Sequence, residues 1–205
     1  NLYCERIGSN IIFLPEVDST NDLIKKYLID NVSEGIVVVA ETQTGGRGRR
    51  GRSWYSPPET GIYLSTLLKP NLELSQLSII TLLAGVAATL TINEFSNQNA
   101  YLKWPNDILI NNKKVCGLLC EMIKKQKELS SVIIGIGINA NQMPEQFPDH
   151  LKSIATSIRI VNGFPIDRLA VIQSFLTNLD REYQTYLNEG ESSVIKKWSL
   201  NTKLF

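Results

Sequence analysis

Continuous apolar runs separated by short polar breaks mark most of the chain. Three of these runs are rich in β-branched residues and lack polar alternation, a pattern typical of strands covered on both faces. Tyr101 begins a further apolar segment that reads as a strand, a polar break and a hairpin with its turn at 111–112. Strands are therefore predicted at 10–14, 36–40, 61–68, 101–121 and 131–138.

Apolar residues at helical spacing predict four helices between these strands and after them. Ser75 is the expected cap of a segment that is apolar on nearly all sides, which indicates a central helix packed on a sheet. Pro165 opens an amphipathic pattern of the same period. The predicted helices cover 19–28, 75–95, 165–186 and 194–198, whereas 142–163 is predicted to be rich in loops.

The segment 45–52 contains four glycines and four arginines and no other residue type. Glycine lets successive backbone N–H groups point at one ligand, and arginine binds phosphate or carboxylate oxygens in pairs. We therefore expect a loop between two strands that is mobile when empty and orders over a phosphorylated ligand. A solvated linker or an RGG-like RNA-binding segment is the alternative. The segment does not match the ATP-binding P-loop, because no Gly-Lys-Ser/Thr follows, or the dinucleotide fingerprint, whose glycine spacing and following helix are missing.

Composition narrows the class of protein. The 205 residues carry 21 lysines and arginines against 20 acidic residues, so a general affinity for nucleic acid or for an anionic membrane is not expected. No transmembrane-length apolar run and no signal peptide are recognised, which predicts one cytoplasmic domain. With His150 as the single histidine and three cysteines without a zinc-like spacing, structural zinc and a histidine-dependent triad are not expected. Cys116 and Cys120 are expected to be buried, inert thiols.

Cations within apolar strands suggest a polar pocket. Lys103 and Lys114 lie in otherwise apolar segments, and Asn106 and Asp107 occupy the break between two strands. Such charged residues are expected to turn towards a pocket. For Lys114, an edge-strand lysine that prevents aggregation is the alternative.

Three other features have two interpretations each. Ser19 or Thr20 is either a helix cap or a hydroxyl offered to a ligand. Trp54 could stack on a flat ligand ring or seal the loop. The alternating glycines of 131–138 leave space for a ligand or for an adjacent helix.

Four segments together resemble, in order and spacing, the catalytic domain of biotin protein ligases. They are Asp18-Ser19-Thr20-Asn21, the stretch from Gln43 to Trp54, Lys103-Trp104-Pro105-Asn106-Asp107 with Lys113-Lys114-Val115-Cys116-Gly117, and Gly135-Ile136-Gly137-Ile138-Asn139. The resemblance covers roughly residues 10–200. It implies an α+β fold similar to class II aminoacyl-tRNA synthetases, with helices backing a mostly antiparallel sheet.

The same resemblance implies a two-step reaction that uses Mg-ATP. The biotin carboxylate attacks the α-phosphate of ATP to give biotinyl-5′-AMP and pyrophosphate. A lysine amine of a biotin carboxyl carrier domain, in acetyl-CoA carboxylase or a similar enzyme, then takes up the biotinyl group.

The residue roles that the resemblance implies fall into three groups. The catalytic residues would be Arg49, Lys114, Lys103 and Asp107. Biotin would be bound by Ser19, Thr20, Gln43, Gly46, Arg47, Lys114 and Gly117. ATP would be bound by Arg49, Arg50, Arg52, Trp54, Asn106 and Asn139, and Asn106 or Asp107 are candidates to orient magnesium.

The sequence departs from many family members at both ends. Residues 1–200 match the catalytic domain, and 201–205 would begin a C-terminal β-barrel that is absent or truncated. An N-terminal helix-turn-helix domain is not recognised, so we expect no DNA binding; a homodimer stays open. The alternatives are a lipoate or octanoate ligase of the same fold, which would carry other loop motifs, and a non-catalytic RNA-binding module.

Overall fold

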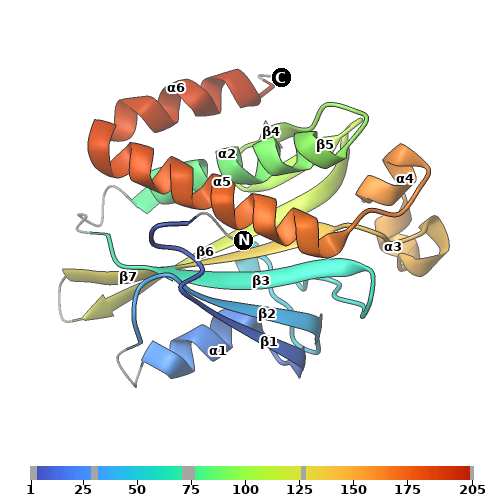
Figure 1. Ribbon diagram of the computed structural model, residues 1–205. Coiled ribbons are helices and arrows are strands. Elements are labelled where there is room, and N and C mark those ends of the chain that lie inside the picture. Colours follow the sequence, from blue (N-terminus) through green and yellow to red (C-terminus); the bar gives the residue numbers. More distant parts are fainter. Residues whose placement is uncertain (1–3, 29–31, 71–76, 126–127, 204–205) are drawn as a thin grey trace.

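The computed structural model describes residues 4–28, 32–70, 77–125 and 128–203, and within them the chain forms one seven-stranded sheet in the order β1-β2-β3-β7-β6-β5-β4 (Figure 1). Only β1 and β2 run parallel; the other neighbouring pairs are antiparallel. The mostly antiparallel sheet expected from the sequence is therefore confirmed. The strands are β1 (Asn10–Val17), β2 (Ile36–Gln43), β3 (Gly61–Leu68), β4 (Tyr101–Lys103), β5 (Asp107–Ile110), β6 (Lys113–Lys125) and β7 (Glu128–Asn139).

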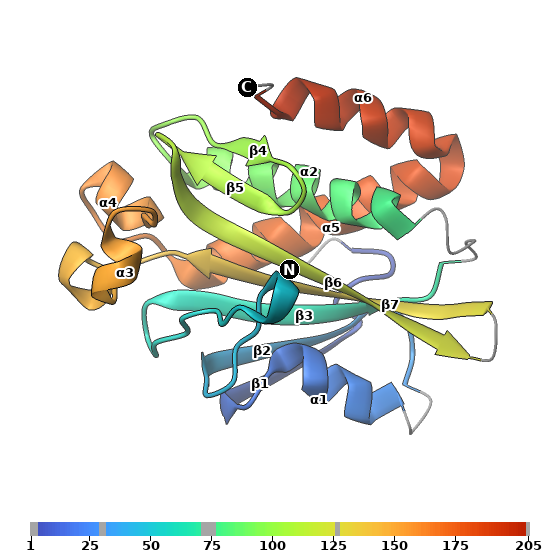
Figure 2. The same ribbon diagram turned by 180° about the vertical axis from the view of Figure 1, so that it is seen from behind.

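Helices cover the two faces of the sheet unequally. The long helices α2, α5 and α6 lie on one face, and the short α1 lies on the other (Figures 1 and 2). Val37 and Val39 belong to the large core under the long helices, whereas Ile36 and Val38 pack with Ile24 of α1. The continuous apolar run of β2 follows from this burial on both faces. The helices are α1 (Thr20–Tyr27), α2 (Leu77–Phe95), α3 (Asp149–Lys152), α4 (Ile158–Asn162), α5 (Arg168–Glu189) and α6 (Glu191–Asn201).

The predicted elements differ from the structure mainly at their ends. The helix expected from Pro165 begins three residues later, because the Asp167 side chain caps it by accepting from Leu169 N at 2.8 Å. The loop-rich prediction for 142–163 missed α3 and α4, which are short and carry little apolar periodicity. The expected cap Ser75 lies outside the described residues.

The expectation that no apolar run reaches transmembrane length is wrong for α2. Its segment Ser78–Phe95 is long and apolar enough by length and composition, and 61% of it is buried inside the protein. The helix is apolar all round because it packs between the sheet and helices α5 and α6. Its composition thus reflects a core position, as expected for a central helix.

One buried carboxylate ties the N-terminal segment to α5. Asp180 accepts backbone N–H bonds from Glu5 at 2.9 Å, Arg6 at 3.0 Å and Ile7 at 2.9 Å. Asp180 is only 4% exposed, so these donors have no ready replacement from water. Three charge-assisted bonds therefore close the segment that precedes β1 onto the last long helix.

We expect Asp180→Asn to lower the free energy of unfolding by about 2 kcal/mol, because one carboxylate oxygen becomes an N–H donor that faces other donors. Urea unfolding measures the change. Asp149→Asn is the matched control, since its side chain is 96% exposed and pairs only with Lys152 on the same helix. Equal stability of the two variants would contradict the assigned role of Asp180.

Candidate functional site

A cavity of about 460 Å³ opens on the α1 face of the sheet. It lies between the start of α1, the Arg/Gly loop (residues 45–52), the strands β5, β6 and β7, and the segment that contains α3. Its volume is in the range of small-ligand sites. Of the predicted site residues, those that line it are Ser19, Thr20, Gln43, Arg47, Arg49, Arg52, Trp54, Lys103, Asn106, Asp107, Lys114, Gly117 and Asn139.

The Arg/Gly loop is a compact turn and not an extended linker. Gly48 N donates to the Arg52 carbonyl at 2.7 Å, and Trp54 N donates to the Gly46 carbonyl at 2.8 Å. Arg50 lies at the tip with φ of 57°, is exposed and does not line the cavity. The structure therefore brings three of the four loop arginines to the cavity and leaves Arg50 outside it.

Gly46 is needed by the loop itself. A Cβ at this position would lie 2.7 Å from the Ser56 hydroxyl oxygen and 2.7 Å from the Trp54 carbonyl oxygen. The residue is buried and does not line the cavity. Its missing side chain therefore serves the close packing of the loop, and the expected close approach to a ligand is not seen there.

The floor of the cavity is sheet backbone at glycines. A Cβ at Gly137 would lie 2.3 Å from the Trp54 ring, one at Gly117 would lie 2.8 Å from the same ring, and one at Gly135 would lie 2.2 Å from Asn21 Oδ1. The space beside the β7 glycines is thus filled by the chain's own side chains, from α1 and from the loop. Trp54 seals the loop against the sheet and also forms part of the cavity wall.

Neutral polar groups gather at one end of the cavity, near the start of α1. The Ser19 hydroxyl caps α1 by accepting from Asp22 N at 3.4 Å, which confirms the cap reading. Thr20 donates to Gln43 Oε1 through its backbone N at 3.0 Å and its hydroxyl at 3.2 Å. The buried hydroxyl of Ser65 lies 2.7 Å from Thr20 Oγ1. Sequence reasoning missed Ser65, because a serine inside an apolar strand gives no motif.

The other end of the cavity is strongly cationic. The lining cations at this end are Arg49, Arg52, Lys103 and Lys114, whereas Arg47 reaches back to α1, and Asp107 is the one carboxylate among the lining residues that the structure describes. Lys114 Nζ lies 2.6 Å from Asp107 Oδ1 and 5.2 Å from the Trp54 ring centre. Arg49 Nη1 lies 3.4 Å from Asn106 Oδ1, a neutral acceptor. Such an excess of fixed positive charge favours an anionic ligand.

Lys114 stands on a well-anchored strand. Lys114 pairs with Leu109 of β5 on one side and with Ala155 on the other, so the edge-strand interpretation of this lysine is wrong. Its backbone N donates to the Ile154 carbonyl at 2.8 Å, and its carbonyl accepts from Thr156 N at 2.9 Å. Asn139 supports the same place by donating to the Thr156 carbonyl at 3.0 Å and, more weakly, to the Lys114 carbonyl at 3.4 Å. The segment after α3 thus fixes the backbone of the lysine.

The remaining reactive side chains offer no second catalytic group. Cys116 is fully buried, and burial raises the pKa of its thiol. Burial also raises the pKa of Cys120 to about 11. His150 is exposed and lies in α3 and not in the predicted loop. Among the described residues no group of three or more His, Cys, Asp and Glu side chains could hold a metal ion.

Comparison with known proteins identifies related sequences. The family model described as "Biotin/lipoate A/B protein ligase family" matches residues 13–139, which is more than half of the chain. The bifunctional ligase/repressor BirA of Bacillus subtilis is 42% identical over 197 residues, which cover 96% of this chain and 61% of that protein. The biotin–[acetyl-CoA-carboxylase] ligase of Mycobacterium tuberculosis is 31% identical over 171 residues, covering 80% and 60% respectively. The chain thus spans about three-fifths of the length of these relatives.

A solved structure shares the fold. The biotin protein ligase from Aquifex aeolicus, in complex with biotin and ATP, superposes with a TM-score of 0.83 at 34% identity, covering 95% of this chain and 78% of that chain. The class II aminoacyl-tRNA synthetase-like fold predicted from the sequence is confirmed by this match.

The raised thiol pKa values predict slow alkylation in the folded protein. With a pKa near 11 in place of the ordinary value, the Cys120 thiolate fraction at pH 8 falls about 100-fold. Alkylation by iodoacetamide should be slower by that factor than in urea, and its rate should rise about tenfold per pH unit up to pH 10. Peptide mass spectrometry measures each site. The structure buries Cys116 fully but leaves Cys120 half-buried, so the expectation of full burial is wrong for Cys120. Equal rates with and without urea would contradict the shielding assigned to both thiols.

Proposed function

Because the chain belongs to the biotin/lipoate A/B protein ligase family, we propose that it is an ATP-dependent biotin protein ligase. It would join biotin to AMP with release of pyrophosphate, and then pass the biotinyl group to a lysine of a carrier protein. The observation that carries this proposal is a single cavity with a neutral end and a cationic end. The two ends match the two parts of the reaction, an uncharged ring system and two anions.

The neutral end suits the biotin body. Its ureido group needs a few aimed polar partners, and Thr20 and Gln43 offer a hydroxyl and an amide at a cavity that Leu119 also lines. Polar groups that already hold one another at fixed distances bind with little loss of side-chain entropy. This arrangement supports an uncharged, hydrogen-bonding head group as the ligand here.

The cationic end suits the joining of a carboxylate to a phosphate. Two anions that approach one another repel, and charge builds on the phosphorus oxygens during attack, so fixed cations lower the barrier. Arg49, Arg52 and Lys103 form no ion pair within the described ranges. Lys114 pairs with Asp107 beside the Trp54 ring. We assign Arg49 and Lys114 to the reacting carboxylate and α-phosphate, and Arg52 and Lys103 to the remaining phosphates.

Magnesium would enter with ATP. Asp107 and Asn106 provide oxygen donors at the cavity wall, which fits an ion that keeps most of its waters and binds phosphates with one or two carboxylates. There it would screen the phosphate charge. In the second step, Asp107 would be the candidate to orient the amine of the incoming lysine, because it is the one carboxylate among the described lining residues.

The partners follow from the relatives. Ligases named for acetyl-CoA carboxylase make a biotin carrier domain of that class the proposed acceptor. A cytoplasmic location, the absence of DNA binding and a homodimer stay predictions, as does the β-barrel expected from 201 onward. A cysteine-dependent octanoyl transfer is disfavoured, because Cys116 is buried and the Cys120 pKa is raised.

The first test is the exchange of labelled pyrophosphate into Mg-ATP, measured separately with biotin, lipoate and octanoate as the carboxylic acid. We expect exchange with biotin and none above background with lipoate or octanoate, with biotinyl-AMP found by mass spectrometry. Exchange with lipoate alone would move the chain to the lipoate branch of the family. Salt-sensitive RNA binding without any exchange would favour the RNA-binding alternative.

The second test removes single cations. Arg49→Ala and Lys114→Ala should each slow adenylate formation about 100-fold or more, because each takes away a fixed charge aimed at the transition state. Arg181→Ala is the matched control, since this arginine is exposed on α5, across the sheet from the cavity, and should change the rate by less than about twofold. Circular dichroism checks the fold. Unimpaired turnover in both cavity variants would contradict the roles assigned to them.

A further inference from the structure

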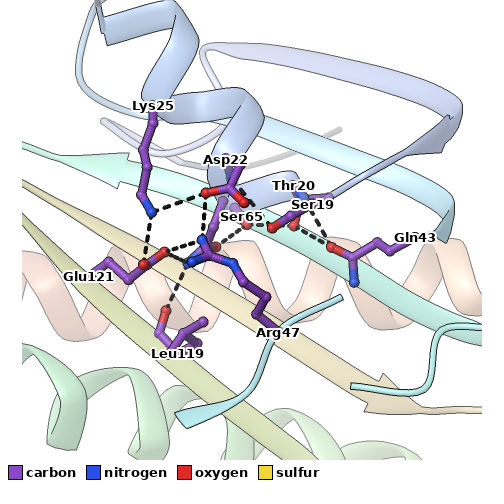
Figure 3. A network of polar contacts seen from close by, with 10 residues as sticks. Ser19, Thr20, Asp22, Lys25, Gln43, Arg47, Ser65, Leu119 and Glu121 are labelled. Atoms are coloured by element: carbon purple, nitrogen blue, oxygen red, sulfur yellow. Dashed lines mark hydrogen bonds and ion pairs between the residues drawn. The ribbon is translucent and has the colours of Figure 1, made fainter. Parts of the chain in front are cut away.

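Glu121 on β6 joins three segments that are far apart in the sequence (Figure 3). Its carboxylate accepts from Asn21 Nδ2 at 2.7 Å, from Lys25 Nζ at 2.8 Å and from Arg47 Nη2 at 3.1 Å. Two of these donors stand on α1 and the third belongs to the Arg/Gly loop. The carboxylate is therefore a common acceptor for the helix and the loop that border the cavity.

Arg47 is held from two sides. The same Nη2 atom that contacts Glu121 lies 2.5 Å from Asp22 Oδ1, in the first turn of α1. The two carboxylates and the two cations Arg47 and Lys25 form a cluster whose formal charges cancel. The Arg47 guanidinium is thus already neutralised by the protein, which sets it apart from the other loop arginines.

Arg49 has different partners from Arg47, which indicates different roles for the two side chains. Arg49 reaches only the neutral oxygen of Asn106, at 3.4 Å, so its charge remains available to an anion. A substrate carboxylate beside Arg47 would meet the negative charges of Asp22 and Glu121 as well, and their repulsion would offset most of the attraction. The geometry favours Arg49 as the anion ligand and Arg47 as a structural anchor.

We propose that Glu121 and Asp22 are positioning residues that hold the Arg/Gly loop closed through Arg47. This proposal refines the role of Arg47, which the family resemblance assigns to biotin binding. Its test by the KM for biotin rests on the proposed ligase function. Closing the loop brings Trp54 onto Gly137 and Gly117 and so completes the cavity wall. Glu121 acts on the reaction through Arg47 and touches no reacting atom.

A second chain of contacts leads from Glu121 to the neutral end of the cavity. Asn21, which donates to Glu121, has its Oδ1 2.5 Å from the Ser65 hydroxyl. That hydroxyl lies 2.7 Å from Thr20 Oγ1 (Figure 3). Thr20 in turn donates to Gln43. The same carboxylate therefore orients the loop and the hydroxyl that would meet the biotin ring.

The decisive experiment is a double-mutant cycle on Glu121→Gln and Arg47→Gln, read as the KM for biotin in pyrophosphate exchange. Each single variant should raise this KM about fivefold, and the double variant should raise it by well below the product of about 25-fold, because the contact between Glu121 and Arg47 is lost in both single variants. The kcat at saturating biotin and ATP should stay within about twofold. Lys25→Met is the matched control: it also removes a partner of Glu121, but it does not touch the loop. Its KM should stay within about twofold of the unmodified chain.

Two kinetic outcomes overturn the proposal. Multiplying effects in the double variant would mean that Arg47 binds substrate independently of Glu121. An unchanged KM in Glu121→Gln would mean that the carboxylate does not position the loop.

A ligand-free measurement separates this proposal from the proposed function. Trypsin cuts after arginine, so cleavage within 47–52 reports how often the loop opens. Glu121→Gln and Asp22→Asn should speed this cleavage about fivefold, and Lys25→Met should not, whether or not the protein makes an adenylate. Equal cleavage rates in all four proteins would refute the anchor even if ligase activity is found.

Discussion

The bare backbone of β6 and β7 is the constraint on which the cavity depends. At Gly117, Gly135 and Gly137 the α1 face of the sheet carries no side chains, and the Trp54 ring and the Asn21 amide lie directly against it. A single methyl group at Gly137 would overlap the ring. The loop can therefore pack on the sheet only where the sheet is glycine, and the cations that it carries are brought to one place as a result.

The charges around the cavity are arranged in two ways. Asp22, Glu121, Lys25 and Arg47 neutralise one another at the border between α1 and the loop. Deeper along the loop and on β4, positive charges stand without carboxylate partners among the described residues. Like charges held close together disfavour the empty form, so an anionic ligand that binds them also stabilises the folded chain.

Much of this arrangement could be predicted from the sequence, for identifiable reasons. The buried strands and the central helix α2 follow from apolar runs, and the density of arginine and glycine in 45–52 indicates an anion-binding loop. Local patterns do not encode contacts between distant segments. The anchoring of Arg47 by Glu121, the buried hydroxyl of Ser65 and the exposed position of Arg50 all depend on how the loop crosses the sheet. The glycines of β7 indicated space for a ligand or for an adjacent helix. Asn21 of α1 lies against Gly135, as the second alternative predicts, whereas nothing in the local sequence indicates that Trp54 lies against Gly137.

The Asp180 carboxylate has a consequence for how the chain folds as it is made. Residues 5–7 are synthesised long before α5, because the acceptor of their backbone N–H groups lies 173 to 175 residues later in the chain. Strand β3 likewise has one unpaired edge until β7 has been synthesised. Until α5 has emerged, the first segment has unpaired donors and the half-built sheet has an open edge, which are the features that recruit chaperones to nascent chains. Completion of this domain is thus set by the synthesis of its last third.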